Sequence, residues 1–281
     1  MAAYEDEILA WRRARDESLR AEDGWLALAG LFWLRQGENR IGADASGEVV
    51  LPADLAPPYL GTLTVSSGHV TLEPAPDTPL TADGEPAGRI ALRADTTGSP
   101  TILRHRRLKM VLIERAGRFG LRVWDSEHAH RRSFPGRVWF PVDSHYRVVA
   151  RFEAYDAARP IAIDTMLGEA VQEDCLGRVA FVLDGIEGSL EALAGDDGGL
   201  FLIFRDATTG ATTYPGGRYL TTEAPSDDQV ELDFNRAYNP PCAFTPYATC
   251  PLPPKGNTLP HRIEAGERFV KDWPAAGSAP D

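Results

Sequence analysis

Short apolar runs, each closed by a pair of turn-forming residues, follow one another along most of this 281-residue chain. Two pairs of runs flank a turn dipeptide and predict β-hairpins: 60–65 with 69–72 around Ser67-Gly68, and 108–114 with 119–123 around Ala116-Gly117. Further runs at 146–155, 179–183, 189–193 and 200–205 continue the pattern. Alternating apolar residues between glycine-containing turns are typical of antiparallel strands. The sequence therefore predicts a mainly β protein.

The first residues of the chain depart from this pattern. Tyr4, Ile8, Trp11 and Leu19 recur at near-helical spacing among acidic and basic residues. This spacing predicts an amphipathic helix over residues 3–21, which ends before Asp23-Gly24. No second helix is predicted.

The length of the chain permits one large β domain or two smaller ones, because a single hydrophobic core stops growing near this size. The stretch HAHRRSFPGRVWFPVDSH contains two prolines and a glycine, which favours a boundary near residue 130. We predict an N-terminal helix at 1–24, a β-sandwich at 25–130 and a second antiparallel β unit, a sandwich or a barrel, at 131–281.

Regular structure is predicted to stop after Asp233. Residues 239–260 contain seven prolines, and proline lacks the amide donor that helices and central strands need. The same residues include Phe244, Tyr247, Leu252 and Leu259, apolar side chains that a solvated linker does not need. We expect an ordered coil that packs on the second β unit; a disordered tail is the alternative.

Charge and cysteine content narrow the class of protein. The chain has 29 basic and 41 acidic residues, a net charge of −12, which disfavours nucleic acid as a partner. No apolar run reaches the about 18 residues that span a bilayer, and the N-terminus is acidic where a signal peptide is basic. Three cysteines are too few for a disulfide framework. We expect a soluble, acidic, cytoplasmic protein that binds no membrane.

Polar side chains that could bind a ligand or take part in catalysis are concentrated in residues 218–267. The candidates for ligand binding are Tyr219, Asn235, Arg236, Tyr238, Asn239, Asn257 and Glu267. The candidates for catalysis are Cys242 as nucleophile, Asp233 as base or orienting group, and Arg218 as the group that binds an anion. Such sets occur where irregular chain covers a rigid sheet. The alternative is that these residues hydrogen-bond the coil's own backbone.

The cysteines and histidines allow several interpretations. Cys242 and Cys250 could be small buried apolar groups, as free cysteines usually are. A disulfide between them would close a loop with seven intervening residues, which a reducing compartment disfavours. Neither has the nearby second thiolate of a zinc site, and we predict no metal. His128 and His130 would share a face on a strand, and Cys175 lies in EDCLG, which is typical of a turn.

Two resemblances add to these observations. Through GWLALAGLFWL, GATTYPGGRYL, DFNRAYNPPCAF, CPLPP and IEAGE, nearly the whole chain resembles the DUF1684 family of bacterial and archaeal proteins, a resemblance that implies no activity. Through GENRIG, VVLP, TADGEPAG and LRVWD, residues 37–124 are similar to a forkhead-associated β-sandwich. In that family an arginine after the IG pair binds phosphothreonine. Here Ala43 follows Gly42, so phosphopeptide binding by that route is not expected.

Two functions stay open at this point. The first is a small-molecule binder, or an enzyme of unknown reaction and unknown cofactor, with its site at residues 218–267 and a small anion as ligand. The second is a non-catalytic protein-interaction module built on the forkhead-associated-like sandwich, with an unknown protein partner. The sequence carries no nucleophile elbow, phosphate-binding glycine loop or dinucleotide fingerprint. Whether the protein is an enzyme is therefore left open.

Overall fold

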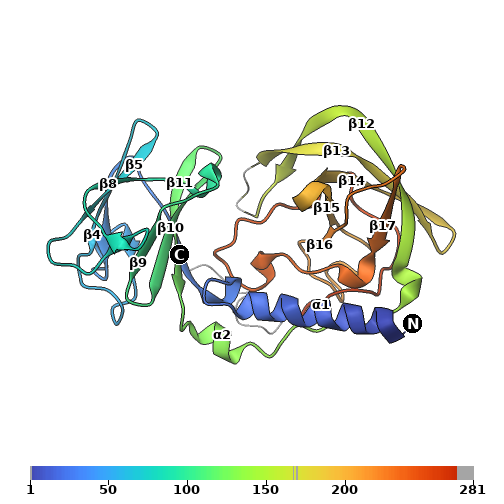
Figure 1. Ribbon diagram of the computed structural model, residues 1–281, viewed down its shortest axis with the longest axis horizontal. Coiled ribbons are helices and arrows are strands. Elements are labelled where there is room, and N and C mark those ends of the chain that lie inside the picture. Colours follow the sequence, from blue (N-terminus) through green and yellow to red (C-terminus); the bar gives the residue numbers. More distant parts are fainter. Residues whose placement is uncertain (1, 167, 169, 271–281) are drawn as a thin grey trace. The chain divides into compact units, whose positions relative to one another are not determined.

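The computed structural model describes residues 2–166, 168 and 170–270 (Figure 1). The chain divides into two compact units. Leu19–Phe134 form one, called here the sandwich unit, and Met1–Ser18 with Pro135–Asp281 form the other, called the C-terminal unit. The helix α1 (Ala2–Arg20) therefore belongs for most of its length to the C-terminal unit, whereas we predicted domain limits at residues 24 and 130.

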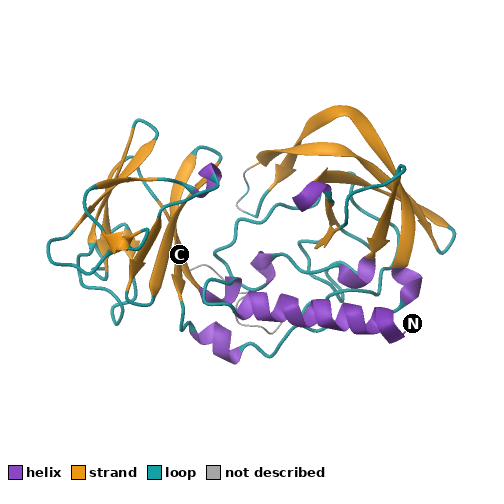
Figure 2. Cartoon of the chain, viewed as in Figure 1, coloured by secondary structure: helices purple, strands orange, loops and turns teal. Residues whose placement is uncertain are grey.

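The sandwich unit consists almost entirely of strands and loops (Figure 2). One sheet has the order β3 (Val49–Val50), β2 (Gly37–Gly42), β4 (Gly61–Ser66), β5 (His69–Pro74), β8 (Ile90–Leu92). The other has the order β1 (Leu28–Trp33), β11 (Arg118–Asp125), β10 (Leu108–Arg115), β9 (Ile102–His105), β6 (Thr81–Ala82), β7 (Glu85–Pro86). Short helical turns are η1 (Trp25–Ala27), η2 (Asp95–Thr97) and α2 (Ala129–Ser133).

Both predicted hairpins of the sandwich unit are confirmed. β4 pairs with β5 and β10 with β11, and the turn residues Ser67 and Gly68 have φ of 51° and 75°. Positive φ at both central positions gives the turn a twist that matches the strands on either side. Ala116 and Gly117, with φ of 48° and 74°, do the same for the second hairpin.

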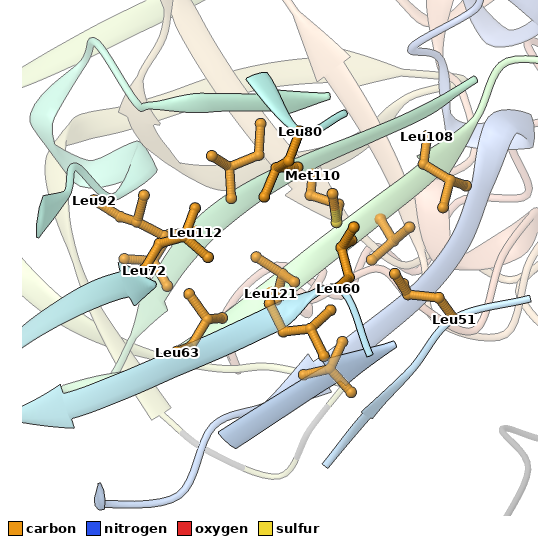
Figure 3. Packing of buried hydrophobic residues seen from close by; sticks show 14 of the residues in the cluster. Leu51, Leu60, Leu63, Leu72, Leu80, Leu92, Leu108, Met110, Leu112 and Leu121 are labelled. Atoms are coloured by element: carbon orange, nitrogen blue, oxygen red, sulfur yellow. The ribbon is translucent and has the colours of Figure 1, made fainter. Parts of the chain in front are cut away.

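The core of the sandwich unit comes from alternating leucines of its two sheets. Leu63 of β4 lies opposite Leu72 of β5, and Leu112 of β10 lies opposite Leu121 of β11. All four are at most 1% exposed and share one buried cluster (Figure 3). Burying each such side chain contributes about 1.5–3 kcal/mol. The apolar alternation in the sequence therefore sets which face of each strand is inside.

The C-terminal unit is a single antiparallel sheet that curls around a coil (Figure 1). Its strands in order are β16 (Arg218–Thr221), β15 (Leu200–Phe204), β14 (Ile186–Ala194), β13 (Ala170–Leu183), β12 (Arg147–Asp164), β17 (Gln229–Asp233). Short turns are η3 (Ser144–Tyr146), η4 (Asp196–Gly198), η5 (Phe234–Arg236) and η6 (Pro241–Ala243). Phe181, Phe204 and Phe234 lie in its core. The predicted mainly β fold with an N-terminal helix is confirmed.

Three local predictions are corrected. Cys175 is not in a turn: it lies within β13 at a bulge and is fully buried. His128 and His130 are not on a strand, because His128 caps α2 and accepts a hydrogen bond from the His130 amide at 3.3 Å. The helix α2 itself, five residues long, was not predicted.

The segment after β17 is an ordered coil through residue 270. Phe244, Leu259, Ile263 and Ala265 are each at most 6% exposed, and the last three belong to the core of the unit. Bridges tie the coil to the sheet, among them Arg205 with Thr258 and Thr165 with Pro251. The predicted packing of the proline-rich coil on the second β unit is confirmed. Residues 271–281 lie outside the described part of the chain.

Crossing a bilayer takes more length and more apolar surface than any helix among the described residues offers.

Candidate functional site

An open pocket of about 630 Å³ lies in the C-terminal unit, called here the Arg205 pocket. It is lined by Met166, Arg205, Tyr214, Pro215, Gly216, Leu252 and Phe269. Met166 follows β12, Arg205 follows β15, and residues 214–216 precede β16. Leu252 and Phe269 belong to the coil. Small-molecule sites typically have volumes of 300–1,000 Å³ and mostly apolar walls. The pocket has the size and the lining of such a site.

The walls of the Arg205 pocket are fixed by contacts behind them. The rings of Tyr214 and Phe269 meet edge to face, with centroids 5.0 Å apart. The amide of Phe269 donates to the Thr212 carbonyl at 3.0 Å, and the amide of Leu252 donates to the Asp164 carbonyl at 2.7 Å. The aromatic and aliphatic surfaces are therefore held in place by the backbone.

Arg205 supplies the charge of the pocket. Its amide donates to the Asn257 carbonyl at 2.9 Å and its carbonyl accepts from the Leu259 amide at 2.8 Å, so the coil pins its backbone on both sides. Its side chain is half-buried. Among the described residues its guanidinium has no hydrogen bond, ion pair or ring partner. A half-buried guanidinium without a carboxylate is a ready donor for an anion.

A second hollow of about 540 Å³ lies over β12 and β13 and the turn at 227–228. Its arginine, Arg151, already pairs with Glu153 at 3.6 Å, and Asp227 and Asp228 also line it. This hollow offers no comparable free donor within the described chain.

Arg218 lies in the core of the unit. It is 1% exposed and pairs with Asp206 at 3.0 Å. Its guanidinium also donates to the carbonyls of Ile263, at 3.1 Å, and Ala265. These bonds anchor the last part of the coil to β16 and to the residue after Arg205.

Asp233, Asn235 and Arg236 gather where α1 meets the end of β17. The Asp233 carboxylate accepts from the Asn235 amide and side chain, both at 3.0 Å, and lies 3.5 Å from Arg236. Arg236 also pairs with Glu7 of α1. The Asn235 side chain exchanges hydrogen bonds with the backbone of Asp143 at 2.8 and 3.0 Å. This group ties the helix to the coil.

Tyr238, Asn239 and Glu267 form a second group under α1. The Glu267 carboxylate accepts from the Asn239 amide at 2.8 Å and lies 3.6 Å from Arg137. Burial raises the pKa of Glu267 to about 7, against the opposing effect of Arg137. The guanidinium of Arg15 lies 3.7 Å from the centre of the Tyr238 ring. These contacts hold the coil against the helix.

Asn257 and Tyr219 support the Arg205 pocket from behind. The Asn257 side chain accepts from the Glu191 amide at 2.7 Å and donates to the carbonyls of Glu191 and Ile203 at 3.0 and 2.9 Å. The Tyr219 hydroxyl donates to the Pro251 carbonyl at 2.9 Å, next to Leu252. Both therefore fix chain segments that carry lining residues.

Cys242 is half-buried in η6. Its carbonyl accepts from the Tyr214 hydroxyl at 3.3 Å, so it lies behind one wall of the pocket. A hydrogen bond with the Cys250 thiol lowers the pKa of Cys242 below its usual range. Cys242 therefore lies next to the sulfur of Cys250, and its backbone carbonyl holds the ring of Tyr214 in the pocket wall.

The ten predicted site residues thus form several groups, and the pocket is lined by other residues. Four of them contact lining residues or the neighbours of lining residues: Arg218, Tyr219, Cys242 and Asn257. The sequence analysis missed Arg205, Met166 and Phe269. Arg205 carries a signal, because it ends the apolar run LFLIF with a cation where a strand meets a turn.

The comparison with protein-family models matches one part of the chain. A family model described as "Protein of unknown function (DUF1684)" matches residues 132–268, which include every lining residue except Phe269. The solution NMR structure of an uncharacterized protein of Haloarcula marismortui is 35% identical, over 51% of this chain and 81% of that chain, with a TM-score of 0.43. No curated protein matches. The likeness of residues 37–124 to a forkhead-associated sandwich gains no support and stays a prediction.

Proposed function

The chain belongs to the DUF1684 family of proteins of unknown function, and we propose that it binds a small carboxylate with an apolar body in the Arg205 pocket. The observation that carries the proposal is Arg205, a half-buried residue of the pocket lining whose guanidinium has no partner among the described residues. Other arginines of the unit, such as Arg218 and Arg236, are already paired with carboxylates.

The anionic end of the ligand follows from the chemistry of Arg205. A guanidinium presents parallel N–H donors that match the two oxygens of a carboxylate. A charge-assisted pair of this kind is stronger where water is partly excluded. The net charge of −12 does not prevent it, because charges beyond a Debye length of about 8 Å are largely screened at physiological salt.

The apolar body of the ligand follows from the walls. Met166, Leu252, Phe269 and the ring of Tyr214 offer aliphatic and aromatic surface around the cation. Each methylene that such a surface buries contributes about 0.8 kcal/mol. A medium-chain fatty acid or an aromatic acid fits this combination better than a sugar or an inorganic anion, which would leave the apolar walls unused.

The supporting residues give the pocket a fixed shape. Asn257 holds the backbone of Arg205, Tyr219 holds the chain beside Leu252, and the carbonyl of Cys242 holds Tyr214. A site that is already formed loses less entropy when the ligand binds. The catalytic roles of Arg218, Asp233 and Cys242 stay predictions, and the proposal concerns binding alone.

The test compares a carboxylate with its neutral analogue. Octanoate and octanamide are titrated into the full-length protein by calorimetry. We expect octanoate to bind at least tenfold more tightly, a difference of about 1.4 kcal/mol. The variant R205Q keeps a polar side chain and removes its charge, so it should lose this preference and bind both probes alike.

R262Q is the matched control. Arg262 is exposed, pairs with Glu264 at 2.9 Å and does not line the pocket, so its loss should leave both affinities unchanged. The variant L252A should weaken octanoate and octanamide equally, because it removes apolar wall only. Equal binding of both probes by the parent protein, or an R205Q variant that keeps its preference for octanoate, would contradict the proposal.

A further inference from the structure

Two of the three cysteines of the chain lie side by side. The Cys242 amide donates to the Cys250 sulfur at 3.2 Å, which places this sulfur against the backbone of Cys242. Both are free thiols. The fold therefore brings two cysteines that are eight positions apart in the sequence together inside the proline-rich coil.

The chain between the two cysteines is itself folded. Ala243, Phe244, Thr245 and Ala248 are each at most 6% exposed. The Thr245 amide donates to the Pro241 carbonyl at 3.2 Å, which closes a turn that contains Cys242. The segment therefore holds the two cysteines close to each other in the reduced protein.

The two thiols differ in exposure and in acidity. Cys242 is half-buried, whereas Cys250 is 4% exposed. The shared hydrogen bond lowers the pKa of Cys242 and, together with burial, raises the pKa of Cys250. The cysteine that is more exposed is thus also the one whose thiol pKa is lowered. This difference suits Cys242 as the attacking cysteine and Cys250 as the cysteine that then forms the disulfide with it.

Cys175 provides the contrast within the same chain. It is fully buried in β13 and donates to the Glu191 carboxylate at 3.1 Å. Burial and this hydrogen bond raise the pKa of its thiol to about 11. A thiol that is buried, protonated and without a sulfur neighbour is inert toward oxidants. It is therefore an internal control.

We propose that Cys242 and Cys250 are a reversible dithiol–disulfide pair that reduces a small hydroperoxide. The Cys242 thiolate attacks one peroxide oxygen, the O–O bond breaks, and the departing oxygen takes up a proton as water or alcohol. Cys242 is then a sulfenic acid. The Cys250 sulfur attacks the Cys242 sulfur, the S–S bond forms, and the hydroxyl leaves as water with the Cys250 proton.

The electrons balance in this sequence. The two thiols lose two electrons and two protons, and the peroxide gains both. A dithiol reductant restores the thiols by exchange. The inference concerns the sulfurs alone and does not depend on the ligand proposed for the Arg205 pocket.

The test uses the reduced full-length protein and one equivalent of hydrogen peroxide. We expect a loss of about 2 Da in the intact mass, a linked peptide pair that contains Cys242 and Cys250, and reversal by dithiothreitol. The variant C175S should behave like the parent protein. C250S should stop at the sulfenic acid, which dimedone traps at Cys242, and C242S should consume peroxide at least tenfold more slowly.

The linked peptides of the parent protein decide the question even if a cysteine variant does not fold. A gain of oxygen mass without the 242–250 link, a disulfide that involves Cys175, or a disulfide between two chains would overturn the proposal. So would a C242S variant that consumes peroxide at the parent rate.

Discussion

The hydroxyl of Tyr4, in the first turn of α1, lies 2.9 Å from both carboxylate oxygens of Asp233 at the end of β17, 229 positions away in the chain. The same hydroxyl accepts from the Asn235 side chain at 3.0 Å. One phenol thus joins the helix to the last strand and to the first residues of the coil. This pairing is one of the contacts that join α1 to the C-terminal unit.

The variant Y4F should lower the free energy of unfolding by about 1–2 kcal/mol, because hydrogen bonds to charged groups are worth more than neutral ones. Urea denaturation measures the change. Y59F is the control: Tyr59 is exposed, its hydroxyl contacts Thr62 at 2.8 Å in the sandwich unit, and its loss should cost less than 0.5 kcal/mol. Equal costs for the two variants would show that the Tyr4 hydroxyl is not a structural link.

Glu267 should make the stability of the C-terminal unit depend on pH. Its folded pKa, about 7, lies above the ordinary value of 4.5, so the folded state binds the proton more tightly than the unfolded state. The resulting stabilisation is complete below about pH 4.5 and is lost as the pH rises through 7. One pKa unit corresponds to about 1.4 kcal/mol, so the loss between pH 5 and pH 8 should be on the order of 2–3 kcal/mol.

The variant E267Q isolates this contribution from the other titrating groups. Its amide stands in for the protonated acid, so the stability difference between E267Q and the parent should shift in favour of E267Q from pH 5 to pH 8. Urea midpoints at both values measure it. A difference that does not change with pH would mean that Glu267 stays ionised, held by Arg137.

Local signals made most of the fold predictable from the sequence. The hairpins around Ser67-Gly68 and Ala116-Gly117 depend on residues that are neighbours in the chain. β12 and β13 are longer than the predicted 146–155 and 179–183. The sequence did not predict the added halves, because they are mostly exposed on both faces and carry no apolar alternation. Their pairing with each other defines them as strands.

The candidate site was less predictable, because it depends on contacts between distant segments. Arg205 is positioned by Asn257, and nothing within either segment indicates that contact. Residues that bind ligands and residues that fix a coil are also of the same types. Arg218 and Asn257 were predicted for their polarity, and the structure uses this polarity for buried hydrogen bonds.

A substitution at Arg218 distinguishes a structural role of this residue from a ligand-binding role. The variant R218M leaves Asp206 buried without its partner, which should cost about 3–5 kcal/mol. R262M is the control, because Arg262 and its partner Glu264 are both exposed, and its loss should cost less than about 1 kcal/mol. Chemical denaturation measures both. An R218M variant of parental stability would return Arg218 to the candidates for binding an anion.

The pair Gly216-Gly217 in the segment GATTYPGGRYL has a strict steric requirement at its second member. Gly217 has a φ of +92°, and a Cβ there would lie 2.6 Å from Pro253 Cγ and 2.7 Å from the Phe204 carbonyl oxygen. G217A should therefore lower the free energy of unfolding by about 2–5 kcal/mol, from backbone strain and from displacement of the coil.

Gly210 provides the matched comparison for this variant. Its φ is +78°, but a Cβ there would meet nothing within 4 Å. G210A should lose about 1 kcal/mol from the positive φ alone. Both changes remove the same freedom from the unfolded chain, so the difference between them isolates the steric contact. If the two variants unfold at the same urea concentration, the coil does not lie against Gly217 as the structure places it. The support behind Leu252 would then be lost, and with it the wall on which the apolar half of the ligand depends.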